Sequence, residues 1–271
     1  MVTPKLRRTF DAIQLGIVLV ILGVPIAWTF LSAFKPSIEV AAIPPKLFFT
    51  PTLDNFVELF SRNDFLKNTI NSFIVATGST LLGLALGIPA AFAMAWHRWQ
   101  WPATATLFAR MAPGTLFLLP WLLMFRQVGL VGGYTAMILT HAVITMPIVI
   151  WVLLPYFESV PRELVESAEM DGARQDQVLR MVVLPVTMGG IVVASILSFV
   201  FSWNYFLFAL VLSGIETKTA IVASFNFIGE GVTNWGALMA AAVVIALPPL
   251  VLTMIIQKRL VGGLAAGAVK G

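Results

Sequence analysis

With 59% hydrophobic and only 11% charged residues among its 271, and a mean hydropathy of +0.92, the chain suits a lipid bilayer better than water. It contains no cysteine, which excludes disulfides, thiolate metal ligands and a cysteine nucleophile. The net charge of +4 does not indicate nucleic-acid binding, because the basic residues are scattered between apolar runs and form no patch.

The first element is an uncharged run over residues 12–34, which follows the basic residues Lys5, Arg7 and Arg8. This run is longer than the apolar part of a typical secretory signal, and no clear small-residue cleavage site follows it. The pattern therefore predicts a retained membrane span. The proline-rich segment after it, residues 35–69, is predicted to be an outer loop that contains a short helix around residues 53–60.

Five further apolar runs are long enough to cross roughly 30 Å of hydrocarbon. They cover residues 70–96, 103–125, 134–156, 186–212 and 236–257. The first run and these five predict an all-α membrane protein of six transmembrane helices, with residues 1–271 forming a single domain. Residues 213–235 are expected to be a second outer loop. The third span is the least regular, because Arg110 and Pro113 interrupt it.

Several features inside the spans favour helix packing over chemistry. Gly83 and Gly87 are small residues one turn apart, a spacing that lets two helices approach closely. His141 has no carboxylate at helical spacing and is expected to bond to a neighbouring helix. No carboxylate pair lies at membrane depth, so we expect no catalytic residue and no metal site.

The distribution of basic residues predicts which way the chain crosses the membrane. Residues 1–11, 97–102, 157–185 and 258–271 carry ten Lys or Arg, whereas the segments on the other side carry six. Because basic loops tend to stay in the cytoplasm, both termini are expected to be cytoplasmic.

The most charged part of the chain is the loop between the fourth and fifth spans, residues 157–185. The stretch 158–180 holds nine of the thirty charged residues. Pro161 at a first-turn position predicts a helix start, and Gly172 predicts the end of that helix in the left-handed conformation. A second helix is expected from about Arg174 to Leu184, before a break into the fifth span at Pro185.

The first of these helices is predicted to be amphipathic. Helical spacing predicts an acidic face of Glu163, Glu166 and Met170, and a small, apolar face of Leu164, Ser167 and Ala168. Such a hairpin either lies on the inner membrane surface or binds a partner.

The order Glu166-Ser167-Ala168, three residues, Gly172, nine residues, Val182, one residue, Leu184-Pro185 resembles the EAA loop of the membrane subunits of bacterial ATP-binding-cassette importers. Ser167 replaces an alanine of that pattern and Val182 an isoleucine. The resemblance implies that the loop docks in a groove of an ATPase subunit and moves with it. It also implies the coupling residues, which are Glu166, Ser167, Ala168, Asp171, Gly172, Leu184 and Pro185.

Arg174 departs from the family pattern. The carbohydrate-uptake branch of this family usually has serine or threonine at this position, which caps the second helix. We therefore expect Gly172 or Ala173 to cap that helix more weakly.

Other stretches resemble the carbohydrate-uptake branch of this family, specifically its maltose-type subunit. They are residues 68–72, Trp203-Asn204 and the glycine-rich end at 262–271. The resemblance implies as partners a second permease subunit, two ATP-binding subunits and an extracytoplasmic solute-binding protein. ATP and Mg²⁺ are then expected on the ATPases, with no cofactor bound by this chain.

Trp203, Asn204 and Tyr205 are candidates for the translocation path. A tryptophan can stack on a sugar ring, and an asparagine inside a span must find a hydrogen-bond partner or face water. The alternative is that Asn204 links two helices.

Two further groups are candidates for contacts with partners. Phe225, Asn226 and Phe227 are candidates for the contact with the binding protein, and the alternative is a turn packed on the chain's own spans. Gly267 and Lys270 are candidates for a contact with the ATPases, and the alternative is a flexible tail.

The sequence therefore indicates a permease subunit of an ATP-driven importer in a bacterial cytoplasmic membrane, which moves a sugar or sugar derivative by alternating access. The alternative is an importer of the same architecture for a polyol, glycerol phosphate or an amino acid. ATP hydrolysis is expected to belong to the partner subunits.

Overall fold

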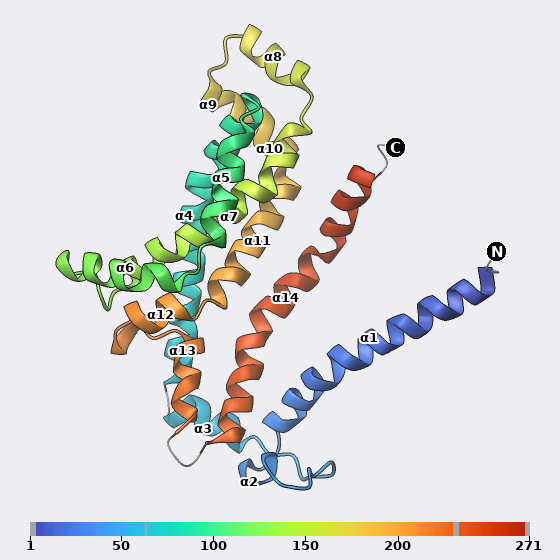
Figure 1. Ribbon diagram of the computed structural model, residues 1–271, viewed down its shortest axis with the longest axis vertical. Coiled ribbons are helices and arrows are strands. Elements are labelled where there is room, and N and C mark those ends of the chain that lie inside the picture. The colour runs from blue at the N-terminus through green and yellow to red at the C-terminus, as the bar shows by residue number, and fades with distance from the viewer. Residues whose placement is uncertain (1–3, 63, 230–232, 269–271) are drawn as a thin grey trace. The chain divides into compact units, whose positions relative to one another are not determined.

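The structure, a computed structural model, describes residues 4–62, 64–229 and 233–268 (Figure 1). Over these residues the chain is helical and contains no strand, which confirms the prediction of an all-α protein. It divides into two compact units, Met1–Leu66 with Ala223–Leu247, and Lys67–Val222 with Pro248–Gly271.

The helices are distributed over both units. Those of the first unit are α1 (Pro4–Ala33), α2 (Ser37–Val40), α3 (Asp54–Arg62) and the 3-10 turn η3 (Phe225–Phe227). Residues of both units occur in α4 (Phe65–Trp96), α13 (Ala220–Ser224) and α14 (Trp235–Ala268). The second unit contains α5 (Gln100–Met111), α6 (Thr115–Gln127), α7 (Tyr134–Glu158), α8 (Arg162–Met170), α9 (Gln175–Val178), the π-helix η1 (Leu179–Val183), α10 (Leu184–Val186), α11 (Met188–Trp203), α12 (Leu207–Leu212) and the 3-10 turn η2 (Ile215–Thr217).

In the described part of the chain, four helices are long and apolar enough to cross a membrane, and they lie in α1, α4, α7 and α14. Two further pairs meet this requirement only together: α5 with α6, bent by 91°, and residues 175–186 with α11, bent by 85°. Counting each pair as one span gives six.

Both bent pairs fall where the sequence predicted continuous spans. The expected span 103–125 is interrupted at residues 112–114, because Pro113 cannot continue a helix. The expected span 186–212 is interrupted at Thr187, and its helix α11 ends at Trp203 before the separate helix α12.

Within the second unit, α4 and α11 pack against α7 (Figure 1). A Cβ atom added to Gly87 would lie 2.7 Å from Cγ1 of Val149 on α7, and one added to Gly83 would collide with Thr145. This confirms that the two glycines allow a close helix contact. On the other side of α7, the ring of Tyr156 lies directly over Gly190 of α11.

Buried polar side chains connect the same three helices. Nδ1 of His141 lies 2.8 Å from Oγ of Ser202, which in turn lies 2.8 Å from Oγ of Ser79. The hydroxyl of Thr145 donates to the main-chain carbonyl of Ser79 at 2.8 Å. The expectation that His141 bonds to a neighbouring helix is confirmed, and these bonds fix the axial register of α4, α7 and α11.

In the first unit, the segment after α1 is a packed structure. Lys35 is only 1% exposed; its Nζ donates to the carbonyl of Lys46 at 2.8 Å and lies 4.0 Å from the centre of the Trp28 ring. The side-chain amide of Asn55 donates to the carbonyl of Ala33, which ends α1 without a helical partner, and to the carbonyl of Lys35 just beyond the helix. Asn55 lies on α3, which confirms the short helix expected around residues 53–60.

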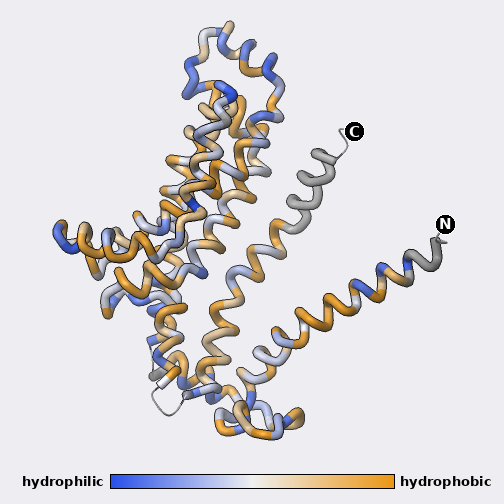
Figure 2. The backbone as a smooth tube through the Cα atoms, in the orientation of Figure 1, coloured by the Kyte–Doolittle hydropathy of each residue, from blue (hydrophilic) through white to orange (hydrophobic). Residues whose placement is uncertain are grey.

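Figure 2 shows where the polar residues of the second unit lie. Hydrophobic residues dominate its long helices, and hydrophilic residues gather on α8, α9 and the loop that joins them. The charged segment predicted between the fourth and fifth spans is therefore a distinct structure at one end of this unit.

Candidate functional site

The first helix of the charged segment, α8, packs on the bundle along one side. It begins after Pro161, which lies at the N-cap and not in the first turn. Val165 is 3% exposed and Ala168 is half-buried, whereas Leu164 and Ser167 are exposed. The bundle therefore covers Val165 and part of Ala168, and leaves Leu164 and Ser167 of the predicted small, apolar face exposed.

The joint at the end of α8 has the predicted geometry. Gly172 has a φ of +86°, in the left-handed region. Its N–H donates to the carbonyl of Glu169 at 3.0 Å, and the N–H of Ala173 donates to the carbonyl of Ala168 at 2.9 Å. This pair of bonds is a Schellman motif, which satisfies the last carbonyls of the helix. Across the joint, the amide of Gln175 donates to the carboxylate of Glu169 at 2.6 Å.

The second helix is capped in a way that the sequence analysis did not predict. Arg174 is its N-cap residue, and the main-chain N–H of Arg174 donates to Oε1 of Gln177 at 2.8 Å. A glutamine three residues after the N-cap satisfies that donor as in one half of a capping box. The prediction that Gly172 or Ala173 caps this helix is therefore wrong.

The rest of the second helix is irregular. The expected helix from Arg174 to Leu184 contains the π-helix η1, in which the N–H of Leu184 donates to the carbonyl of Leu179. The following residue, Pro185, has no N–H to continue the ladder. The break predicted at Pro185 nevertheless lies at Thr187, because α10 passes through the proline before the chain turns by 85°.

Three valines hold the hairpin on the bundle. Val165, Val178 and Val183 are at most 3% exposed and belong to one apolar cluster with Phe92 of α4 and Phe157 of α7. Burial of a valine contributes about 1.5–3 kcal/mol. The hairpin is therefore fixed to the ends of α4 and α7 on its inner side.

The outer side of the hairpin is exposed. Glu163, Glu166 and Met170 are all exposed, which confirms the predicted acidic face, and Met170 is 88% exposed. The expected coupling residues divide into exposed Glu166, Ser167, Asp171, Gly172 and Pro185, and half-buried Ala168 and Leu184.

The three residues expected along a translocation path have different environments. Trp203 is 3% exposed and packs between Phe73 at 4.7 Å and Phe199 at 5.7 Å between ring centres. Tyr205 is half-buried beside His141. Asn204 is exposed, and its amide donates at 2.8 Å to a carbonyl of its own helix four residues earlier. Asn204 is therefore the most exposed member of this group.

The residues expected to contact partners also differ in exposure. Phe225 is 51% exposed and Asn226 is exposed, whereas Phe227 is 6% exposed and packs on Phe65 within the first unit. The backbone at Gly267 belongs to α14. Lys270 lies outside the described residues.

Two residues near the hairpin were not identified from the sequence. The capping role of Gln177 could have been predicted from the sequence, since glutamine is common at the third helical position. No sequence pattern identified Arg98. It follows α4 with a φ of +54°, and only the fold brings it close to α8.

No group of three His, Cys, Asp or Glu that could hold a metal ion occurs among the residues that the structure describes. The ion pair of the hairpin, Arg174 with Asp176 at 3.3 Å, is exposed. The outer side of the hairpin is therefore an exposed, polar surface.

Comparisons with known proteins show which family the chain matches. Residues 83–265 match the family described as binding-protein-dependent transport system inner membrane component. The chain is 34% identical over 276 residues to the trehalose transport system permease protein SugB of Mycobacterium tuberculosis, covering 98% of both chains. It is 31% identical over 238 residues to the trehalose/maltose transport system permease protein MalG of Thermococcus litoralis, covering 84% of both.

A solved structure has a similar fold. A chain of a bacterial ABC transporter involved in the import of the acidic polysaccharide alginate superposes with a TM-score of 0.77 at 19% identity, covering 95% of this chain and 98% of that one. At this identity the likeness concerns the fold.

Proposed function

The chain belongs to the family of binding-protein-dependent transport system inner membrane components, and on this basis we propose that it is a permease subunit that imports a sugar or sugar derivative. The observation that carries the proposal is the hairpin. Its inner side is packed on α4 and α7 through buried valines, while its outer side exposes Glu166 and Met170. A displacement of the outer side by a bound protein would therefore be transmitted to the membrane helices.

The choice of a sugar rests on the relatives. SugB and the Thermococcus MalG are named for trehalose and for trehalose/maltose transport, and both align over most of this chain. A polyol, glycerol phosphate or amino acid is the alternative, and it is an outcome of the test below.

The assembly that we propose contains this chain, a second permease subunit, two ATP-binding subunits and an extracytoplasmic solute-binding protein. The ATPases bind and hydrolyse ATP with Mg²⁺, and this chain catalyses no reaction. The hairpin lies on the cytoplasmic side, as do both termini. This orientation is supported by the excess of basic residues in the segments predicted to be cytoplasmic.

The mechanism follows from the connections of the hairpin. Closure of the ATPase dimer moves α8, and the Schellman joint at Gly172 passes the displacement to α9 without bending. The π-helix η1 and α10 connect to α11 through the 85° turn at Thr187, so the motion reaches the end of α11 at Trp203. The helices then switch between outward-facing and inward-facing arrangements, which is alternating access by movement of packed elements.

Purification and reconstitution test this proposal. We expect the tagged chain, expressed in its own cell, to co-purify with an ATPase and a second permease. In proteoliposomes that contain the binding protein, the complex should take up radiolabelled trehalose or maltose only with ATP. Absence of an ATPase would contradict the importer, and uptake of glycerol 3-phosphate or an amino acid in place of sugar would contradict the substrate class.

We expect Asn204→Ala to weaken sugar transport while leaving ATPase binding intact, since Asn204 is the exposed polar side chain at the end of α11. Loss of one hydrogen bond to a sugar hydroxyl costs about 1.4 kcal/mol, so the half-saturating sugar concentration should rise about tenfold. Ser195→Ala is the matched control, because the Ser195 hydroxyl also donates to a carbonyl four residues earlier in α11. Equal effects of the two substitutions would indicate a helix defect and not a contact with sugar.

A further inference from the structure

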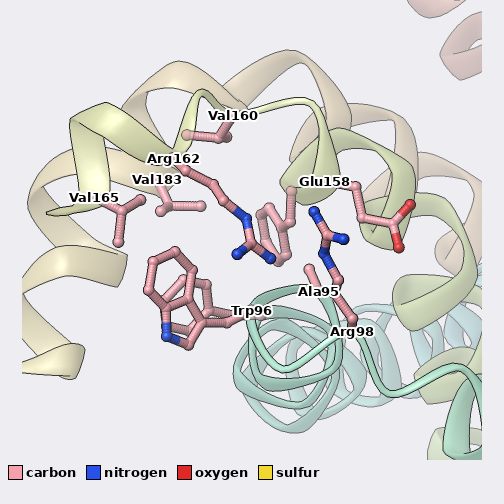
Figure 3. Close-up of a pocket in the computed structure, with 10 residues that line it drawn as sticks. Ala95, Trp96, Arg98, Glu158, Val160, Arg162, Val165 and Val183 are labelled. Atoms are coloured by element: carbon pink, nitrogen blue, oxygen red, sulfur yellow. The ribbon is translucent and has the colours of Figure 1, made fainter.

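A cavity of about 300 Å³ lies between α8 and the ends of α4 and α7 (Figure 3). Phe92, Trp96 and Phe157 contribute apolar wall, and Arg98 and Arg162 contribute charge. The volume is in the range of ligand pockets. This cavity is separate from the exposed acidic face of α8.

The two guanidinium groups enter this cavity from different elements. Arg98 follows α4 in the left-handed conformation, which is rare for a residue with a side chain, and Arg162 is the first residue of α8. Figure 3 shows both groups directed into the same space, while the carboxylate of Glu158 points away from it.

Neither arginine forms an ion pair with a carboxylate in the described part of the chain. Arg162 lies over the Trp96 ring, 5.7 Å from its centre. Two like charges that share one cavity repel each other, and an anion bound between them removes that repulsion. The cavity therefore has the charge of an anion site.

The position of the cavity indicates which anion reaches it. The membrane-spanning helices α4 and α7 end beside it, at Trp96 and Glu158. The nearby side chains of Trp99 and Trp101 are 52% and 75% exposed, and exposed tryptophans mark the membrane–water interface. The arginines therefore lie at the depth of lipid headgroups.

We propose that this cavity binds the phosphate of an anionic phospholipid headgroup through Arg98 and Arg162. A guanidinium matches a phosphate with two parallel hydrogen bonds, and basic pockets at the ends of membrane helices bind such headgroups. The apolar wall accommodates the first carbons of the lipid. A bound lipid fills the space between hairpin and bundle and braces α8 against α4 and α7.

Native mass spectrometry of the full-length chain, with whatever subunits co-purify, tests this site. The probes are phosphatidylglycerol and phosphatidylcholine with the same acyl chains. We expect the wild type to prefer phosphatidylglycerol. Arg98→Gln and Arg162→Gln should each weaken phosphatidylglycerol binding about fivefold, since one arginine near an anionic surface contributes about 1 kcal/mol. Binding of phosphatidylcholine should not change.

Matched variants distinguish the loss of a specific lipid site from a general loss of positive charge and from misfolding. Arg174→Gln removes a guanidinium from the same hairpin outside the cavity and should leave lipid preference unchanged. Arg98→Lys and Arg162→Lys keep the charge but lose the paired hydrogen bonds, so each should bind phosphatidylglycerol more strongly than the glutamine variant and more weakly than the wild type. If Arg174→Gln has the same effect as the cavity variants, or if the two lipids bind equally to the wild type, the proposal is overturned.

A second measurement separates the lipid from other anions. Hydrogen exchange of α8 should be slowed by phosphatidylglycerol in nanodiscs and not by inorganic phosphate in phosphatidylcholine nanodiscs. Protection by inorganic phosphate alone would assign the site to a free anion. Loss of ATPase co-purification with unchanged lipid binding would assign the arginines to a protein contact. These experiments measure lipid binding and hydrogen exchange and do not measure sugar uptake. A negative result would therefore contradict the lipid site without contradicting the proposed sugar import.

Discussion

Gly172→Pro is expected to abolish sugar uptake and the stimulation of the ATPase by loaded binding protein, while the protein remains in the membrane. Gly172 has a φ of +86°, which proline cannot adopt, and its N–H donates to Glu169. A cost of about 3 kcal/mol to the native joint corresponds to about a hundredfold less coupled transport. ATP-dependent uptake in proteoliposomes and ATPase rate measure the effect.

Substitutions at the same position provide the control. Gly172→Asn should retain most of the transport, because asparagine tolerates the left-handed conformation. Gly172→Ala should be intermediate, with about fivefold less transport for a cost of about 1 kcal/mol. If proline and asparagine gave the same activity, the geometry of the joint would have no role in coupling.

Gly87→Leu is expected to lower the free energy of unfolding by about 3 kcal/mol, the upper part of the range for overpacking. The first carbon of any side chain at Gly87 meets Val149 of α7 at 2.7 Å. The helices must therefore separate, which also loosens the buried bonds around His141. The unfolding midpoint of the detergent-purified chain and its amount in the membrane measure the loss.

Two variants test whether the close contact is the cause. Gly16→Leu on α1 places the same side chain where an added Cβ meets nothing within 4 Å, and it should leave the midpoint unchanged. Combining Gly87→Ala with Val149→Ala removes the colliding methyl of Val149. The double variant should therefore lose less free energy of unfolding than the two single variants lose in sum. Additive effects would show that the two positions are not coupled.

Much of the fold was predictable because the signals are local. A span is predicted by an apolar run long enough for the bilayer, and the run at 134–156 lies inside α7 (Tyr134–Glu158). The end of α8 was predictable for the same reason: Gly172 is where a residue without a side chain takes the left-handed conformation and closes the helix. The glycine pair in α4 predicted a close contact, although not that α7 supplies it.

The site was less predictable, because burial depends on which helix packs on which. Helical spacing placed Leu164 and Ser167 on one small, apolar face of α8, but it did not indicate that the bundle covers Val165 and leaves those two residues exposed. A tryptophan in the fifth span suggested stacking on a sugar, and packing against Phe73 and Phe199 buries it.

The sequence by itself determined where the chain is apolar enough to cross a membrane, where the first helix of the charged hairpin ends, and which family pattern that hairpin carries. These properties depend on neighbouring residues along the chain. Only the tertiary structure decided the turn at Thr187, the side of α8 that is left exposed, and the meeting of Arg98 with Arg162 in one cavity. Those outcomes depend on contacts between residues far apart in the sequence, whose geometry no local pattern encodes.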